Sequence, residues 1–168
     1  METTEMQKAH HFLFLALAGC LCGCYLPQAE SALIRNFRAH RPAFDELLKL
    51  AAGDPDHPRI SGGQVPPVGM RPERFALYKE LFRKLNIDSG LTRYSAYPGA
   101  VFLIVSSDIP IGGKSQSQGY VHSASLLAPL ANSLDLPTLP LEIHRSSGSR
   151  IVFRQLDDEW YLFSDASW

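Results

Sequence analysis

The apolar positions in the first half of the chain recur at the spacing of amphipathic helices. Between residues 29 and 53 they lie three, four and seven positions apart, which gives a helix one apolar stripe. Pro42 interrupts this stripe because proline lacks a backbone donor, so we expect a kink or two short helices near Arg41. Gly53 supplies a stop for the helical pattern. A second helix is predicted from Pro72, with an apolar face made of Phe75, Tyr78, Leu81, Phe82 and Leu85.

A stretch rich in turn-forming residues separates the two helical patterns. Residues 54–69 contain four prolines and three glycines, which are too many for regular structure. With sixteen residues the stretch is longer than most connectors, and such length is typical of a functional or a mobile loop. We therefore expect the segment from Asp54 to Gly69 to be a loop that offers a contact surface to a partner.

The second half of the chain predicts strands. Val101–Val105 is apolar throughout, as in a central strand that is covered on both faces, and Asp157-Asp158-Glu159 predicts a tight polar turn between the last two strands. Helices followed by strands predict an α+β fold, with two N-terminal amphipathic helices packed on a mostly antiparallel sheet of about five or six strands. The predicted strands are Leu91–Ala96, Ala100–Ser107, Gly119–Ser123, Leu141–His144, Ile151–Leu156 and Trp160–Phe163.

An apolar run near the start of the chain indicates export. Phe12 to Leu26 is fifteen residues without a charge, which is short of the ~20 that a membrane-spanning helix needs and suits a secretory signal. Within this run, the sequence Leu17-Ala18-Gly19-Cys20 resembles the lipobox of bacterial lipoproteins. The resemblance implies that the thiol of Cys20 is diacylated and that this cysteine becomes the new N-terminus.

The resemblance also implies a division of the chain and a location. Leu21 would follow the lipidated cysteine, and the familiar retention signal for the inner membrane is an aspartate at that place. Its absence favours the outer membrane, with the domain facing the periplasm. The alternative is that residues 12–26 stay uncleaved as a hydrophobic anchor. The implied parts are residues 1–19 as a lipoprotein signal peptide, residues 20–28 as a lipidated tether and residues 29–168 as a single α+β domain.

The first residues do not have the charge of a signal peptide, which should begin with a basic segment. Glu2 and Glu5 stand against the single Lys8. A start at Met6 would give a positive segment of ordinary length ahead of the apolar run. We therefore expect translation to begin at Met6 rather than at Met1.

Composition and charge exclude several function classes. All three cysteines lie within residues 20–24, so the body of the chain has no disulfide framework, no cysteine nucleophile and no thiolate metal site. Sixteen basic and seventeen acidic residues give a formal net charge of −1, so we expect no nucleic-acid partner. We interpret Arg35, Arg38 and Arg41 as a solvated helix face.

Residues 108–115, with the sequence DIPIGGKS, nearly match the phosphate-binding pattern G-x-x-x-x-G-K-[ST]. The first glycine of the pattern is replaced by Asp108, and the segment leads into a strand rather than into a helix whose N-terminus could receive phosphate. We therefore expect a loop between strands instead of a nucleotide site. Lys114 and Ser115 in this loop are candidates for contact with a partner.

His122 is the candidate for catalysis. It precedes Ser123 and Ser125, so a hydrolase triad is conceivable. The nucleophile pattern G-x-S-x-G is absent, however, and a structural histidine is favoured. The acids that could complete such a triad are Asp45, Asp108 and Glu142.

Metal sites and aromatic platforms are not favoured by the spacing of the residues. Histidines 40, 57, 122 and 144 stand alone, and the Asp54–His57 segment breaks the calcium-loop pattern, so we expect no metal and no cofactor. Trp160, Tyr161 and Trp168 could form a platform for a glycan or a peptide, but we interpret them as core residues.

The end of the chain carries a second resemblance. The segment from Phe153 to Phe163, in which a polar turn precedes a Trp-Tyr-Leu strand, resembles the closing hairpin of small bacterial proteins without an established activity. The strand at Gly119-Tyr120 and the helices around Phe37–Leu48 and Phe75–Leu85 share this resemblance, which spans most of the mature chain. It implies a fold but no reaction.

Together these patterns predict a lipoprotein of the cell envelope that binds rather than catalyses. The membrane is its partner through the lipid on Cys20, and an envelope protein is the expected second partner, with the loops at Asp54–Gly69 and Lys114 as contact surfaces. The alternative function is a periplasmic hydrolase that uses His122 with a nearby serine or carboxylate. A third hypothesis is a purely structural envelope component.

Overall fold

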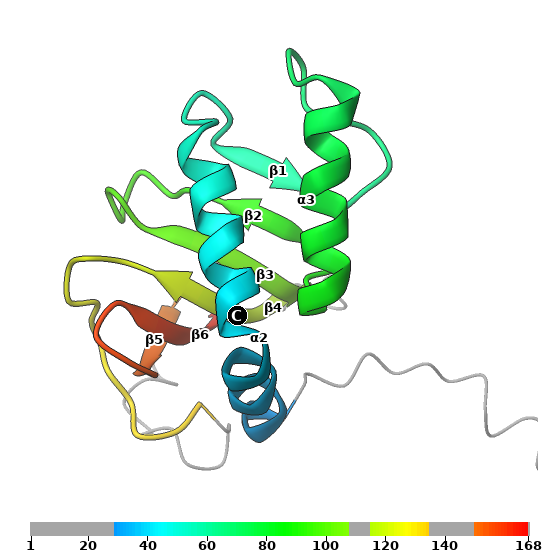
Figure 1. The fold of residues 1–168 in the computed structure, drawn as a ribbon. Coiled ribbons are helices and arrows are strands. Elements are labelled where there is room, and N and C mark those ends of the chain that lie inside the picture. Colours follow the sequence, from blue (N-terminus) through cyan, green and yellow to red (C-terminus); the bar gives the residue numbers. More distant parts are fainter. Residues whose placement is uncertain (1–28, 108–114, 135–149, 168) are drawn as a thin grey trace, which may run out of the picture.

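The computed structural model describes residues 29–107, 115–134 and 150–167 of the chain, and within these ranges it forms two helices and six strands (Figure 1). The predicted α+β class is therefore confirmed. The predicted strand at Leu141–His144 and the expected signal and tether lie outside the described residues. The elements are α2 Glu30–Ala52, β1 Arg59–Ser61, α3 Pro72–Leu85, β2 Gly90–Thr92, β3 Val101–Ser107, β4 Ser115–His122, β5 Arg150–Gln155 and β6 Trp160–Ser167.

The strands form one antiparallel sheet in the order β1-β2-β3-β4-β6-β5, and α2 and α3 cross one of its faces (Figure 1). β3 lies between β2 and β4, as the apolar segment Val101–Val105 predicts. Its side chains alternate between the two faces, because successive strand residues point to opposite sides. Leu103 and Val105 join the cluster that includes the helix side chains, whereas Phe102 and Ile104 join a second apolar cluster.

Both predicted helices are present, and α2 has the predicted kink. His40 has non-helical dihedral angles (φ −122°, ψ 19°), two residues before Pro42, so the helix consists of two segments. α3 begins with Pro72 in its first turn and ends at Leu85, and it is capped by Asn86, whose φ of 54° is left-handed. All five residues of its predicted apolar face are buried. Neither helix among the described residues is long and apolar enough to cross a membrane.

The aromatic residues between α2 and the sheet form the centre of the larger cluster. Phe44, with 0% exposure, contacts Tyr120 of β4 (ring centroids 4.7 Å apart) and Trp160 of β6 (5.3 Å). The hydroxyl of Tyr120 donates to the carbonyl of Leu33 at 3.0 Å, and burial raises the pKa of Tyr120 to about 12. Trp160 and Tyr161 are thus core residues, as predicted, while Trp168 lies outside the described residues.

The prediction of a continuous loop from Asp54 to Gly69 is wrong in its middle. Arg59–Ser61 forms the strand β1, which pairs with β2 and buries Ile60 completely. Three residues with one apolar side chain, flanked by Pro58 and Gly62, are too short to show a strand period. The strand is stabilised by its pairing with β2 rather than by the propensities of its own residues.

Three other strands differ clearly in length from their predictions. β2 ends at Thr92 instead of Ala96, β4 begins at Ser115 instead of Gly119, and β6 ends at Ser167 instead of Phe163. The early start of β4 places serines and glutamines in a strand because β6 pairs with it along its whole length, up to Ser167. Hydrogen bonds with a neighbouring strand here outweigh the low apolar content.

Candidate functional site

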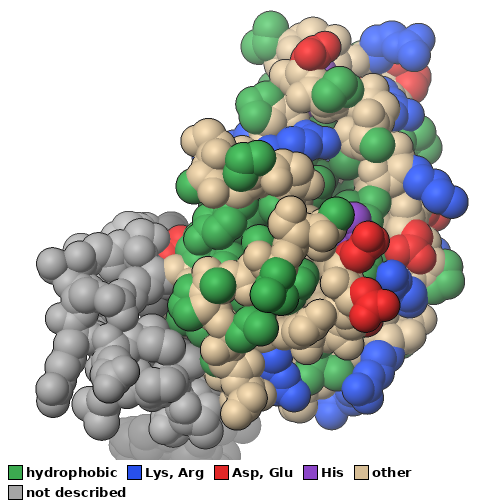
Figure 2. All heavy atoms as spheres, turned by 90° about the vertical axis from the view of Figure 1, so that its left-hand side faces the viewer, with side chains coloured by type: hydrophobic (Ala, Val, Ile, Leu, Met, Phe, Trp, Pro, Cys, Tyr) green, Lys and Arg blue, Asp and Glu red, His purple; other side chains and the backbone are tan. Residues whose placement is uncertain are grey.

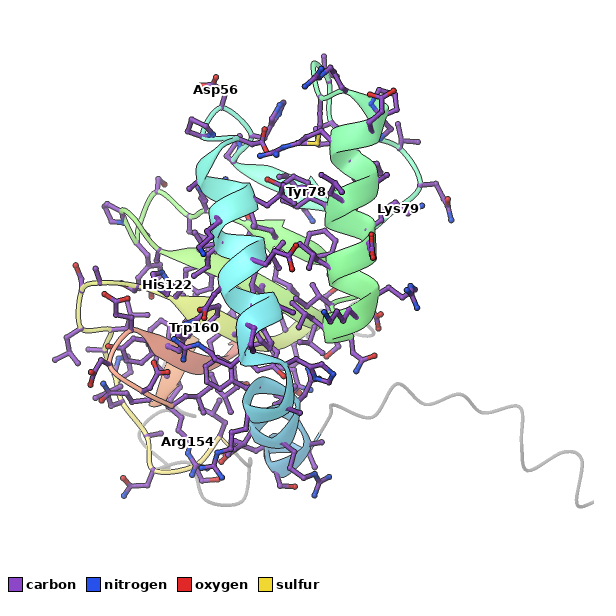
Figure 3. All side chains as sticks on the ribbon, viewed as in Figure 1. Asp56, Tyr78, Lys79, His122, Arg154 and Trp160 are labelled. Carbon is purple, nitrogen blue, oxygen red and sulfur yellow. The ribbon has the colours of Figure 1, made fainter. Side chains whose placement is uncertain are left out.

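His122 lies at the end of β4, beside the turn that joins β5 and β6. Its Nε2 is 3.1 Å from Oε2 of Glu159, and its ring meets that of Trp160 with centroids 5.2 Å apart. Figure 3 shows His122 and Trp160 next to each other. The structure therefore provides His122 with an acidic neighbour that the sequence did not single out. The sequence contained a clue to this neighbour, because Glu159 belongs to the predicted turn between the last two strands. The antiparallel pairing of β4 with β6 brings this turn to His122.

The serine next to His122 is engaged elsewhere. The hydroxyl of Ser123 donates to the carbonyl of Ser125 at 2.9 Å and accepts from its amide at 3.1 Å, and Ser123 is buried. Asp45, one acid of the conceivable triad, pairs with Arg41, and the other two acids lie outside the described residues. The structure thus brings together His122 and Glu159, while the Ser123 hydroxyl closes a local turn.

The sequence predicts that Arg41 belongs to a solvated helix face, but its side chain contacts other parts of the domain. Its guanidinium pairs with Asp45 at 3.2 Å and with Asp157, and it lies 5.0 Å above the ring of Phe37 and 5.6 Å from that of Trp160. Arg41 therefore joins α2 at its kink to the turn between β5 and β6. Burial acts to lower the pKa of Arg41, but the two carboxylates raise it on balance. Arg35 and Arg38 are exposed, as predicted.

A second polar cluster joins the end of α2 to α3. Oδ2 of Asp54 accepts from Nε of Arg74 at 2.9 Å and from the hydroxyl of Tyr78 at 2.6 Å. Figure 3 shows Tyr78 pointing from α3 toward α2. Arg74 and Arg93 also donate to the carbonyls of the last helical turn, at Leu50 and Ala51. These contacts satisfy carbonyls that a helix end leaves without partners, so the cluster has a structural task.

This cluster predicts how stability depends on pH. Partial burial acts to raise the pKa of Asp54, but the hydrogen bonds from Tyr78 and Arg74 outweigh it and the net pKa is lowered. The stabilisation is therefore present above the ordinary pKa near 4 and is lost as the pH falls through the lowered value. We expect Asp54→Asn to lower the free energy of unfolding at pH 7 by about 1–2 kcal/mol, and this difference should shrink below about pH 4. Urea unfolding between pH 7 and pH 2.5 measures it.

Asp56 supplies the matched control. It lies two residues further along the same loop with an exposed side chain that points away from the helices (Figure 3). Asp56→Asn is expected to leave both the stability and its pH dependence unchanged. If the free energy of unfolding depends on pH in the same way in both variants, the pH-dependent stabilisation does not come from Asp54.

No group of three or more histidine, cysteine, aspartate or glutamate side chains suited to a metal ion occurs among the residues that the structure describes. His40 is bound through Nδ1 to the carbonyl of Asn36 at 3.1 Å. The carboxylate of Asp54 in the segment Asp54–His57 is held by Arg74 and Tyr78. The carboxylate of Asp54 thus serves the helix end.

Among the residues that the structure describes, the most exposed large apolar side chains lie between β1 and α3. Val68 is 99% exposed and Val65 is 76% exposed, on either side of Pro66 and Pro67. A groove of about 480 Å³ lies along α3, where Lys79 points away from α2 (Figure 3), and Nζ of Lys79 is 3.4 Å from Oε1 of Gln64, the residue before Val65. We call the two valines and this groove the α3 surface. The groove is lined by Gly62, Lys79, Glu80, Phe82, Arg83, Ile87 and Asp88.

A second groove of about 380 Å³ lies between α2 and α3 and includes Leu77, which is 47% exposed. A third exposed apolar area is on the face shown in Figure 2, where hydrophobic side chains gather in the centre and charged side chains lie mainly along the right-hand edge and at the two ends. The loop that follows β4 lies on that side of the molecule (Figure 1), and its residue Leu126 is 72% exposed. The exposed apolar residues are therefore concentrated on loops and on α3.

The predicted contact loops have different outcomes. Lys114 lies outside the described residues, and Ser115 is the first residue of β4. The longer predicted loop contains β1, but its remainder carries both exposed valines. Comparison of the chain with family models, with curated proteins and with solved structures finds no match.

Proposed function

We propose that the chain is a lipoprotein of the cell envelope, anchored in the outer membrane by a lipid on Cys20, whose folded domain binds another envelope protein through the α3 surface. The observation that carries this proposal is the exposure of Val65 (76%) and Val68 (99%) on a segment whose Gly62 lines the groove along α3. Exposed apolar side chains rimmed by polar and charged residues are typical of protein-binding surfaces. This binding function does not require catalytic activity.

The beginning of the fold is consistent with a tether that ends at residue 28. α2 starts at Glu30, which is 6% exposed and accepts hydrogen bonds from Ser133 and from the amide of Leu134. It also pairs with Arg154, which lies near the start of α2 in Figure 3. The chain is thus fixed to the domain two residues after the proposed tether. In the proposed division, residues 29–168 form one domain in which α2 and α3 make a layer on the sheet.

The alternative function is a periplasmic hydrolase, and the observation that favours it is the pair of His122 and Glu159. An acid at this distance can orient a histidine that acts as a base. A hydrolase would also need a nucleophile or an activated water, and the Ser123 hydroxyl already makes two hydrogen bonds with Ser125. Trp160 packs against the ring of His122, with centroids 5.2 Å apart, and supplies no second reactive side chain. We therefore favour binding.

Substitution of Cys20 tests the anchor. Cys20→Ser removes the only proposed acceptor of the lipid, so we expect loss of acyl labelling and loss of the chain from the membrane fraction. Cys22→Ser is the matched control because it removes a thiol two residues away, and it should remain labelled and membrane-bound. If Cys20→Ser stays in the membrane at full length, the apolar run is a plain anchor and the lipoprotein proposal is wrong.

The same membranes test binding. After solubilisation with detergent, an envelope protein should co-purify with both the wild-type chain and the Cys22→Ser control. Recovery of the chain alone, in spite of correct lipidation, would contradict the binding half of the proposal.

A further inference from the structure

The segment Val65–Val68 has a defined geometry. Proline fixes φ near −65° and keeps the residue before it extended, so Val65 and Pro66 are both held in extended backbone. A tight turn follows, in which the amide of Met70 donates to the carbonyl of Pro67 at 3.0 Å. Gly69 has a φ of +86°, which the third position of a type II turn requires. Val68 therefore lies at the tip of this turn.

Both ends of the segment are fixed to the domain. Met70 is buried, and the amide of Gly62 donates to the carbonyl of Ser89 at 3.3 Å. A Cβ on Gly62 would lie 2.2 Å from the carbonyl oxygen of Asp88, so the chain runs directly against its neighbour there. The two exposed valines therefore lie on a segment whose two ends are anchored to the domain. Such an arrangement loses little conformational entropy when it binds.

We propose that Val65–Val68 is itself the recognition element, which inserts into an apolar groove lined by aromatic side chains on a partner protein. Proline-containing segments bind such grooves because their backbone is already ordered before binding. The valines project outward, so the complementary hollow belongs to the partner. This inference rests on the proposed binding function and adds the chemistry of the partner.

The position of the turn favours a protein over a lipid bilayer. It lies at the opposite end of the domain from the start of α2, to which the proposed lipid is attached through the tether (Figure 1). The 23 residues of α2 span about 35 Å if straight. An anchored domain therefore presents Val68 away from its own membrane.

Crosslinking in native membranes tests the inference. A photoreactive amino acid is placed singly at position 65, 68, 77 or 126 of the full lipidated chain. Adducts with a protein are expected from positions 65 and 68 and not from 126, which is exposed on another loop. A cyclic peptide of residues 61–71 should reduce these adducts at least about tenfold, and the same peptide with both valines changed to serine should not. In the whole chain, Val65→Ser with Val68→Ser should abolish co-purification of the crosslinked protein.

The controls separate recognition from folding and from the broader proposal. The double variant should unfold at the same denaturant concentration as wild type, because both side chains are exposed, and Leu126→Ser should still co-purify with the partner. Adducts with phospholipid alone, or protein adducts that neither peptide reduces, would overturn the inference. A protein adduct from position 77 without one from 65 or 68 would overturn it while leaving the binding function intact. Absence of protein adducts at all four positions would count against both.

Discussion

Replacing Phe44 by alanine is expected to lower the free energy of unfolding by about 3–5 kcal/mol. Phe44 is completely buried, and its ring contacts those of Phe37, Tyr120 and Trp160 at centroid distances of 5.2, 4.7 and 5.3 Å. These contacts join α2 to β4 and β6, and alanine would leave a cavity between the helix and the sheet. Edge-to-face ring pairs add to the loss from reduced burial. Guanidinium unfolding at neutral pH measures the effect.

Two controls show whether the effect arises from this packing. Phe44→Leu retains most of the volume and should cost about half as much or less. Leu126→Ala removes a similar apolar group from a side chain that is 72% exposed, and it should change the free energy by less than about 0.5 kcal/mol. If Phe44→Ala costs no more than Leu126→Ala, the helix does not pack on the sheet in solution.

The helices could be predicted closely because their order is local. The 3.6-residue period marks all the buried positions of α3, and Pro42 marks the kink of α2 within two residues. The apolar run at Val101 likewise identifies a central strand. In each case the side chains that define the element are neighbours in the sequence.

The parts that could not be predicted depend on residues far apart in the chain. β1 is ordered by its pairing with β2, and the polar start of β4 by its pairing with β6. Arg41 meets Asp157 across 116 positions of sequence. A composition argument treats such a residue as a solvated charge because it has no information about the distant partner.

The candidate site shows the same limit on a smaller scale. Ile60 and Val65 are both single apolar residues in a segment rich in proline and glycine, and nothing local distinguishes them. The first is completely buried and the second is 76% exposed, because only Ile60 lies in a paired strand. The sequence therefore predicts an accessible segment but not which of its side chains faces a partner.

Gly90→Ala is expected to lower the free energy of unfolding by about 3–4 kcal/mol. Gly90 begins β2 with a φ of +97°, a conformation that side chains disfavour. An added Cβ would also lie 2.2 Å from the carbonyl oxygen of Ile60 and 2.7 Å from the amide nitrogen of Gly62. Both atoms belong to the backbone, so β1 would have to move away and would lose its pairing with β2. Thermal and denaturant unfolding measure the loss.

Two other glycines separate the two causes. Gly99 has a φ of +79° but no atom within 4 Å of an added Cβ, so Gly99→Ala should cost only the backbone strain, about 1–2 kcal/mol. At Gly119, whose φ is not in the positive range, the Cβ would lie 2.0 Å from the carbonyl oxygen of Leu103, so Gly119→Ala tests the close approach alone. If Gly90→Ala costs no more than Gly99→Ala, β1 does not lie against β2 as described. The segment that presents Val65 and Val68 would then lack its fixed base, because β1 leads directly into it.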